Sequence, residues 1–178
     1  MITLSAHLRA ATRRDHEAID AVYGGFDLAS REGYADFLEA HARILPLAER
    51  LLAPQSLAAG WRGRTAALLA DLKALGHAPP PELDFTLPSG EAARWGAFYV
   101  IEGSRLGGAV LARSIPAGLP SAYLSAQHPP GAWRALLQSL DDSETGPDWR
   151  EEAVSGAQAM FGAYRSAALG ARKAPSEA

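Results

Sequence analysis

One histidine of this sequence has the neighbours that a metal ligand needs. His16 and Asp20 are four residues apart, and in a helix that spacing brings two side chains together on one face. A carboxylate that accepts a hydrogen bond from one ring nitrogen orients the imidazole and leaves the other nitrogen free to bind a metal ion. Arg9 lies seven residues earlier, so a straight helix would place this cation on the same side, about 10 Å away. A histidine on a helix more often has a structural role, and the interpretation therefore needs a second element.

The second element is the glycine-rich stretch 96–113, GAFYVIEGSRLGGAVLAR, which otherwise reads as helix. A glycine inside a helix is destabilising by about 0.5–1 kcal/mol relative to alanine. At about 100° per residue, Gly96, Gly103 and Gly107 share one narrow stripe. Such a stripe exposes backbone without side chains, and it can accept either a closely packed helix or a flat ligand. The pattern alone leaves both interpretations open.

Composition narrows the class of protein. The chain has 178 residues, of which 48% are hydrophobic and 21% charged, so we expect one domain with a substantial core. A net charge of −3 gives no reason to expect nucleic acid or an anionic membrane as a partner. The absence of cysteine excludes disulfides, thiolate ligands and a thiol nucleophile. The charged N-terminus is unlike a signal peptide, and no predominantly apolar run reaches about 18 residues. We therefore expect a cytoplasmic protein without membrane insertion.

Abundant alanine and leucine, with few β-branched residues, predict an all-α fold of six or seven helices. The first helix is expected from Leu4 to just before Gly24. Further helices are predicted over 30–53 with a break near Pro46, over 61–76, from the cap Ser89 through the glycine-rich stretch, over 131–140 and from Pro147 onward. Residues 54–60 are expected to form a loop and 77–90 an extended connection. Residues 1–170 are then one domain, and 171–178 a frayed tail.

The remaining histidines and motifs favour no other site. His41 lies in mid-helix, where a hydrogen-bonded core histidine is the ordinary interpretation, and it is the second candidate for a metal ligand. His77 and His128 fall in proline-rich loops and are expected to face solvent. The sequence has no Glu-x-x-His pair, no His-Glu-x-x-His motif and no Gly-x-Ser-x-Gly elbow. These absences weaken a di-iron bundle, a zinc protease and a hydrolase.

A haem would satisfy both candidate elements. Its iron would bind His16, its anionic propionates would meet Arg9, and one face of the porphyrin would lie on the glycine strip. Two helices would then enclose the ring from opposite faces.

From residue 4 to about 165 the sequence resembles the haem oxygenases, the helical enzymes that open haem to biliverdin. The segment LSAHLRAATRRDHEAID is similar to that family's proximal helix, with His16 at the iron ligand and Asp20 where glutamate is commoner. The segment YVIEGSRLGGAVL is similar to the distal helix, with Gly103 and Gly107 at the two glycines that lie over the haem. Ser104 stands at the small polar position after the first glycine, as in many bacterial members.

The resemblance implies a single-domain helical bundle with haem b, as cofactor and substrate, between the proximal helix and a kinked glycine-rich distal helix. It implies His16 as the iron ligand, Gly103 and Gly107 as shields of the open face, and Ser104, with ordered water, as a hydrogen-bond donor there. The residues expected around the rest of the haem are Arg9, Arg13 and Arg134 at the propionates, and Asp20, Tyr99, Phe161 and Tyr164 at the pocket.

The implied activity is dioxygen-dependent cleavage of haem into biliverdin, carbon monoxide and ferrous iron. Because the chain has no flavin, nicotinamide or iron–sulfur motif, electrons must come from a separate donor such as a ferredoxin or a reductase-type protein. A phytochrome that accepts biliverdin is a further candidate partner. Two alternatives remain, a haem carrier or sensor of the same fold without turnover and a haem-free helical interaction domain. His16, the glycines and Arg9 argue against the second alternative, whereas nothing in the sequence excludes the first.

Overall fold

The computed structural model describes residues 2–53 and 61–171, which contain helices and connections but no strand. The helices are α1 (Leu4–Ala11), α2 (Arg13–Tyr23), α3 (Arg31–Ala42), α4 (Leu45–Leu52), α5 (Thr65–Ala74), α6 (Glu91–Leu111), the 3₁₀ turn η2 (Ala112–Ser114), α7 (Ala122–Ser125), α8 (Ala132–Ser143) and α9 (Pro147–Ala171). None of these described helices is long and apolar enough to cross a membrane. The predicted loop at 54–60 and the predicted tail beyond Ala171 lie outside the described residues.

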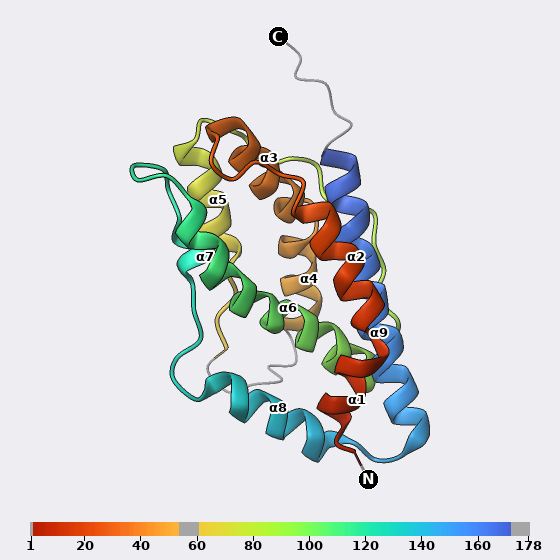
Figure 1. Cartoon of the computed structure of the whole chain (residues 1–178). Coiled ribbons are helices and arrows are strands. Elements are labelled where there is room, and N and C mark those ends of the chain that lie inside the picture. The colour runs from red at the N-terminus through yellow and green to blue at the C-terminus, as the bar shows by residue number, and fades with distance from the viewer. Residues whose placement is uncertain (1, 54–60, 172–178) are drawn as a thin grey trace.

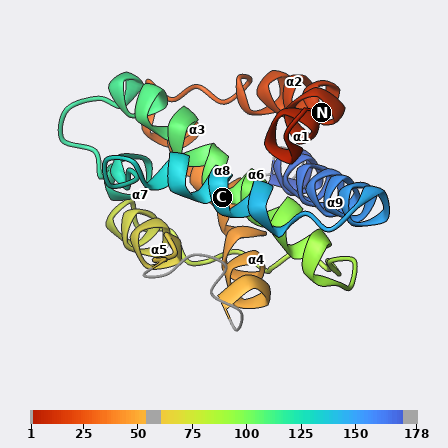
Figure 2. The ribbon, with the colours of Figure 1, turned by 90° about the horizontal axis from the view of Figure 1, so that it is seen from below.

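The long helix α6 runs through the centre of the molecule (Figures 1 and 2). In both views α9 lies along one side of it, and α5 and α7 lie on the other. The helix α8 crosses near the middle of α6, and α2 packs on α9. Both elements that carry the predicted site, α2 and α6, are therefore supported by α9.

The backbones of α6 and α9 come into close contact where each helix has a glycine. A Cβ on Gly96 would meet the carbonyl of Ala153, and a Cβ on Gly156 would meet the carbonyl of Ala93. Any larger side chain would push the two helices apart, because packed interiors leave no room for it. Close helix packing is therefore the right interpretation for Gly96, at one end of the predicted stripe.

The first predicted helix is divided at Thr12 into α1 and α2. The hydroxyl of this buried residue donates to the carbonyl of Leu8 at 2.8 Å, and its backbone, at φ −99° and ψ 9°, leaves the helical region. A β-branched residue that bonds back to the preceding turn disturbs a helix. The prediction of one straight helix was wrong, and the position of Arg9 relative to His16 depends on this break.

Both halves of the divided helix are fixed to their neighbours. The backbone N–H and the hydroxyl of Ser5 donate to the Asp141 carboxylate on α8, at 2.7 and 2.9 Å. The Tyr23 hydroxyl donates to the Tyr164 carbonyl on α9, at 3.2 Å. These bonds hold α1 to α8 and the end of α2 to α9.

The other predicted helix starts hold with two corrections, and α8 ends at Ser143, three residues beyond its predicted end. The chain divides near Pro46 as predicted, which separates α3 from α4. However, α5 begins at Thr65 and not at Trp61, because the carboxylate of Glu49 caps it from another helix. That carboxylate accepts from the backbone N–H groups of Arg64 and Thr65 at 2.6 and 3.0 Å, satisfying donors that a helix start leaves free.

The second correction concerns the start of α6. Gly90, with a φ of 109° that favours glycine, precedes its first residue, and Ser89 is not the cap. The start of α9 at Pro147 is as predicted. The described residues form nine α-helices, more than the predicted six or seven. The additional helices come from the division of two predicted helices and from α7, which lies in a proline-rich stretch without a helical hydrophobic pattern.

Candidate functional site

His16 is oriented on α2 by contacts from two sides. Its Nδ1 lies 3.0 Å from Oδ2 of Asp20, one turn later. Its ring meets the edge of the Phe161 ring on α9, with centroids 6.0 Å apart. An imidazole that donates through Nδ1 keeps a free lone pair on Nε2. Because the side chain is 63% exposed, that lone pair is accessible to a ligand.

Two observations relate α1 and α2 to α6. At one end, burial raises the pKa of Tyr99 and the Arg9 cation opposes part of the rise. At the other end, Asp20 and Leu111 line the same cavity. From Arg9 to Asp20 is 11 residues, and from Tyr99 to Leu111 is 12. The two stretches therefore run in the same direction with nearly equal spacing.

Gly103 and Gly107 lie on the part of α6 between Tyr99 and Leu111. A Cβ on Gly107 would have no described atom within 4 Å, and one on Gly103 would meet only Cη2 of Trp133, at 3.5 Å. Unlike Gly96, these two glycines have no close neighbour that forbids a side chain. Their bare backbone supports the flat-ligand interpretation for this half of the stripe.

A cavity of about 510 Å³ lies between the end of α2, the connection that follows it and the end of α6. Its lining combines apolar side chains with two carboxylates. The lining residues are Asp20, Tyr23, Gly24, Phe26, Asp27, Leu28, Ala29, Leu111 and Ser114. On another part of α6, the ring of Tyr99 lies 5.8 Å from that of Trp133 on α8. The residues around α6 thus form a cavity near Asp20 and Leu111 and an aromatic pair near Tyr99.

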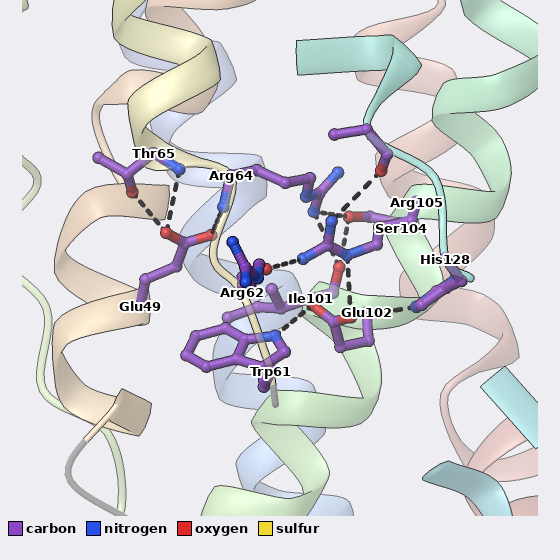
Figure 3. A network of polar contacts seen from close by, with 11 residues as sticks. Glu49, Trp61, Arg62, Arg64, Thr65, Ile101, Glu102, Ser104, Arg105 and His128 are labelled. Carbon is purple, nitrogen blue, oxygen red and sulfur yellow. Dashed lines mark hydrogen bonds and ion pairs between the residues drawn. The ribbon is translucent and has the colours of Figure 1, made fainter. Parts of the chain in front are cut away.

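The Ser104 hydroxyl flanks the bare strip but already has partners. It donates to the carbonyl of Ile101 at 2.6 Å and accepts from Nη2 of Arg64 at 2.6 Å (Figure 3). A hydroxyl has one proton, so in this arrangement Ser104 can accept a further hydrogen bond but cannot donate one. Donation toward a ligand, the role predicted from the sequence, then requires an intervening water molecule.

Among the described residues, no three His, Asp or Glu side chains lie close enough to bind a metal ion by themselves. The iron of a porphyrin is held by the four ring nitrogens and needs one axial imidazole from the protein. The free Nε2 of His16 fits that requirement. The bare backbone of Gly103 and Gly107 fits the face of a flat ring.

No protein-family model matches the sequence. A curated relative, the heme oxygenase of Xanthomonas campestris pv. campestris (strain 8004), is 38% identical in an alignment that covers 75% of this chain and 87% of that protein. The chain belongs to the haem oxygenase family. A solved structure, the NO- and CO-bound heme oxygenase from Neisseria meningitidis, matches with a TM-score of 0.83 and 26% identity over 100% of this chain and 96% of that one. The all-α haem oxygenase fold predicted from the sequence is confirmed.

The residues that the haem oxygenase resemblance assigns to the propionates are not equally placed. Arg9 and Arg134 are exposed on the adjoining helices α1 and α8, and neither forms an ion pair with another described residue. Arg13 lies near Glu17, with 3.9 Å between Nε and Oε1, and 77% of its side chain is exposed. Arg9 and Arg134 have cationic groups free for an anion, whereas Arg13 already has a carboxylate beside it.

His128 is not where the sequence placed it. The prediction that it faces solvent was wrong, because its side chain is only 11% exposed and its Nε2 lies 3.0 Å from Oε2 of Glu102 on α6. Burial lowers the pKa of His128, and the Glu102 carboxylate opposes part of that change. His77 is 38% exposed, with Nδ1 2.7 Å from Oε1 of Glu39.

His41 is a core residue, in agreement with its mid-helix position. Its Nδ1 donates to the carbonyl of Phe37 at 2.9 Å. The rings of Tyr23 and Tyr123 lie 4.6 and 5.2 Å from it between centroids. Burial lowers the pKa of His41 to about 3, so the ring stays neutral. Enclosed in this way, it does not compete with His16 as an iron ligand.

The sequence analysis missed a buried polar cluster that faces α5 and the loop before α8 (Figure 3). The Glu102 carboxylate accepts from Nε of Arg105 at 2.8 Å and from Nε1 of Trp61 at 2.9 Å. Arg105 also donates to the carbonyls of Arg62 and Ala126. Opposite charges three residues apart inside a largely apolar helix were the available signal, because such charges are buried only when paired.

Proposed function

We propose that this chain is a haem oxygenase that cleaves haem to biliverdin, carbon monoxide and ferrous iron in the groove between α2 and α6. The observation that carries the proposal is the placement of His16. Its Nδ1 is held by Asp20 at 3.0 Å and its side chain is 63% exposed, while α6 offers bare backbone at Gly103 and Gly107.

The groove suits the two unlike edges of a haem. Arg9 and Arg134 stand at the end where Tyr99 meets Trp133, and guanidinium groups bind carboxylates strongly. The 510 Å³ cavity at the other end, with Phe26 among its lining residues, has room for the edge without propionates. Haem would thus lie with its propionates toward α1 and α8.

Bound haem supplies the iron that activates dioxygen and is itself the molecule that is oxidised. The protein's contribution is orientation and exclusion. Asp20 keeps the His16 ring in the tautomer that leaves Nε2 free. Gly103 and Gly107 let backbone approach the open face, so that only small molecules fit there. Ser104 offers an acceptor that can hold a water molecule beside that face.

Electrons are supplied by a second protein in this proposal, because the sequence has no motif for a flavin, nicotinamide or iron–sulfur cluster. A ferredoxin or a reductase-type protein is the expected donor class. A biliverdin-accepting phytochrome is a candidate for the product, and a cytoplasmic location accommodates both. Each of these partners is testable by adding it to the purified protein.

The decisive experiment adds hemin to the purified protein, then a reductant under air, and follows the visible spectrum with time. We expect a histidine-ligated Soret band that decays while the broad absorption of biliverdin grows. A stable Soret band without biliverdin would indicate a haem carrier or sensor. No Soret band at all would indicate a helical interaction domain, and either result would contradict the proposal.

A further inference from the structure

Arg64 is a buried cation that touches the helix carrying the bare glycine strip. Only 2% of the residue is exposed. Its Nη2 donates to the Ile101 carbonyl at 2.9 Å and to Oγ of Ser104 at 2.6 Å. Figure 3 shows the guanidinium reaching from the start of α5 to this turn of α6. Arg64 is therefore the residue through which α5 contacts the Ser104 hydroxyl.

The surroundings of Arg64 do not compensate its charge in the usual way. Within the described residues, no carboxylate oxygen lies within 4.0 Å of its guanidinium, and its buried Nε has no hydrogen-bond partner. Its Cζ lies 5.0 Å from the centre of the Tyr123 ring, a favourable but weaker contact. Burying a cation without a paired anion is unfavourable. Such an arrangement calls for a role beyond stability.

Holding the segment before α5 against α6 does not require this charge. Arg105 already joins the two, since it donates to the Arg62 carbonyl while bonded to Glu102. The Nε1 of Trp61 makes a second link to Glu102 at 2.9 Å. What Arg64 adds is the bond to Ser104, whose side chain is about 60° around the helix from Gly107.

The contacts of Ser104 fix the direction of its hydroxyl. The proton points to the Ile101 carbonyl, and one lone pair accepts a hydrogen bond from Arg64. Only the second lone pair is left to accept another hydrogen bond. We propose that Arg64 is a positioning residue for the haem-facing side of α6 and acts through the Ser104 hydroxyl. By occupying one lone pair, it holds Ser104 as a hydrogen-bond acceptor beside Gly103 and Gly107. This inference deepens the proposed function and rests on it for its purpose.

The test compares Arg64→Met, Arg64→Lys and the double variant Arg64→Met with Ser104→Ala. Lysine keeps the charge, but its side chain ends short of the position of Nη2. Arg94→Met is the matched control. Like Arg64, Arg94 has a buried Nε without a hydrogen-bond partner, but it lies on α6 itself, ten residues before Ser104. Arg64→Lys also keeps the test available if Arg64→Met does not fold.

The first readout needs no haem. Side-chain scalar couplings of Ser104 are measured by NMR on the apo protein. They should show one χ1 rotamer in the original chain and in the control variant Arg94→Met. They should show averaging over rotamers in Arg64→Met and Arg64→Lys. A single unchanged rotamer in both Arg64 variants would overturn the inference.

The second readout is the infrared stretching band of carbon monoxide on the ferrous haem complex. We expect one narrow band in the original chain and a split or broadened band in either Arg64 variant, because a rotating hydroxyl presents several environments. The double variant should return to one band, since alanine has no hydroxyl to rotate. A band that stays broad in the double variant, or stays narrow in both Arg64 variants, would contradict action through Ser104.

The two proposals fail differently. If the original chain forms no haem complex, the proposed function is wrong, while the Ser104 couplings still decide whether Arg64 positions that side chain. If haem binds and is cleaved but neither readout changes, only the role of Arg64 is wrong.

Discussion

At the scale of single residues, two histidines of this chain have similar partners and different surroundings. His16 places Nδ1 3.0 Å from Asp20, and His77 places Nδ1 2.7 Å from Glu39. A carboxylate partner alone therefore does not identify an iron ligand. What distinguishes His16 is its exposure, 63% of the side chain against 38% for His77.

Replacing His16 with alanine should abolish the histidine-ligated Soret band and biliverdin formation, because the iron loses its axial imidazole. His77→Ala is the control, since it removes an imidazole with a similar carboxylate contact far along the chain. Visible spectra of both hemin complexes check this expectation. A normal Soret band in His16→Ala, or its loss in His77→Ala, would show that the ligand is assigned wrongly.

Replacing Arg9 or Arg134 with glutamine should weaken haem binding without changing the ligation of the iron. A charge-assisted contact with a propionate at a partly exposed position contributes about 1–2 kcal/mol, or roughly 5- to 30-fold in Kd. Lys73→Gln on α5 is a control for the loss of one exposed positive charge. Hemin titration gives the Kd, and equal affinities in all three variants would remove both arginines from the site.

At the scale of elements, α6 has two halves that use glycine for different reasons. Near its start, Gly96 lies against the backbone of α9 at Ala153. Farther along, Gly107 has no described neighbour at the place a Cβ would occupy. One helix thus combines a tight packing contact with a bare surface, and only the bare turns stay open to the flat-ligand interpretation.

The two halves should respond oppositely to the same substitution. Gly96→Ala should lower the free energy of unfolding of the apo protein by roughly 1–3 kcal/mol through overpacking. Gly107→Ala should raise it by about 0.5–1 kcal/mol, because alanine favours the helix and meets no obstacle. Urea unfolding of the two apo variants measures both changes. A large loss of stability in Gly107→Ala would mean that packing, not a ligand, requires this glycine.

A larger side chain at Gly107 tests the same surface from the haem side. We expect Gly107→Leu to keep the apo fold but to lower the biliverdin yield, since its side chain would enter the groove. The measurement is turnover per haem-loaded molecule, with Ala70→Leu at an exposed position of α5 as control. Normal turnover in Gly107→Leu would place the reaction elsewhere.

At the scale of the whole molecule, stability depends on a neutral histidine at the meeting point of several helices. His41 is buried among aromatic rings of α2, α3, α7 and α9. Its pKa is lowered from 6.5 to about 3, chiefly by burial. The unfolded chain takes up a proton at His41 below about pH 6.5, while the folded protein does not until about pH 3.

The sign of the resulting pH dependence follows directly. Between about pH 6.5 and 3 the unfolded state binds more protons at this site, so stability is lost as the pH falls, with a slope of up to about 1.4 kcal/mol per pH unit. His41→Gln should flatten this part of the curve, whatever its stability at neutral pH, and His77→Gln is the control. Urea unfolding at several pH values checks it, and an unchanged slope in His41→Gln would exclude His41 as the cause.

The sequence by itself determined what depends on residues within about one helical turn or on composition. The all-α class, the break near Pro46, the start of α9 at Pro147 and the His16–Asp20 pair all belong here. Helical geometry fixes which side chains meet at four residues' separation, and proline restricts its own backbone wherever it occurs. The family resemblance added the fold, because it rests on two such local motifs.

Only the tertiary structure decided which partners meet across long separations. It showed that Gly96 packs on α9 while Gly107 stays open, and it brought His128 onto Glu102 and Arg64 onto Ser104, 26 and 40 residues apart. The bond between Thr12 and Leu8, by contrast, is local. Whether the helix is straight or divided there nevertheless depends on the packing of α1 and α2 on α8 and α9. No periodicity encodes these choices, because each depends on how whole helices settle against one another.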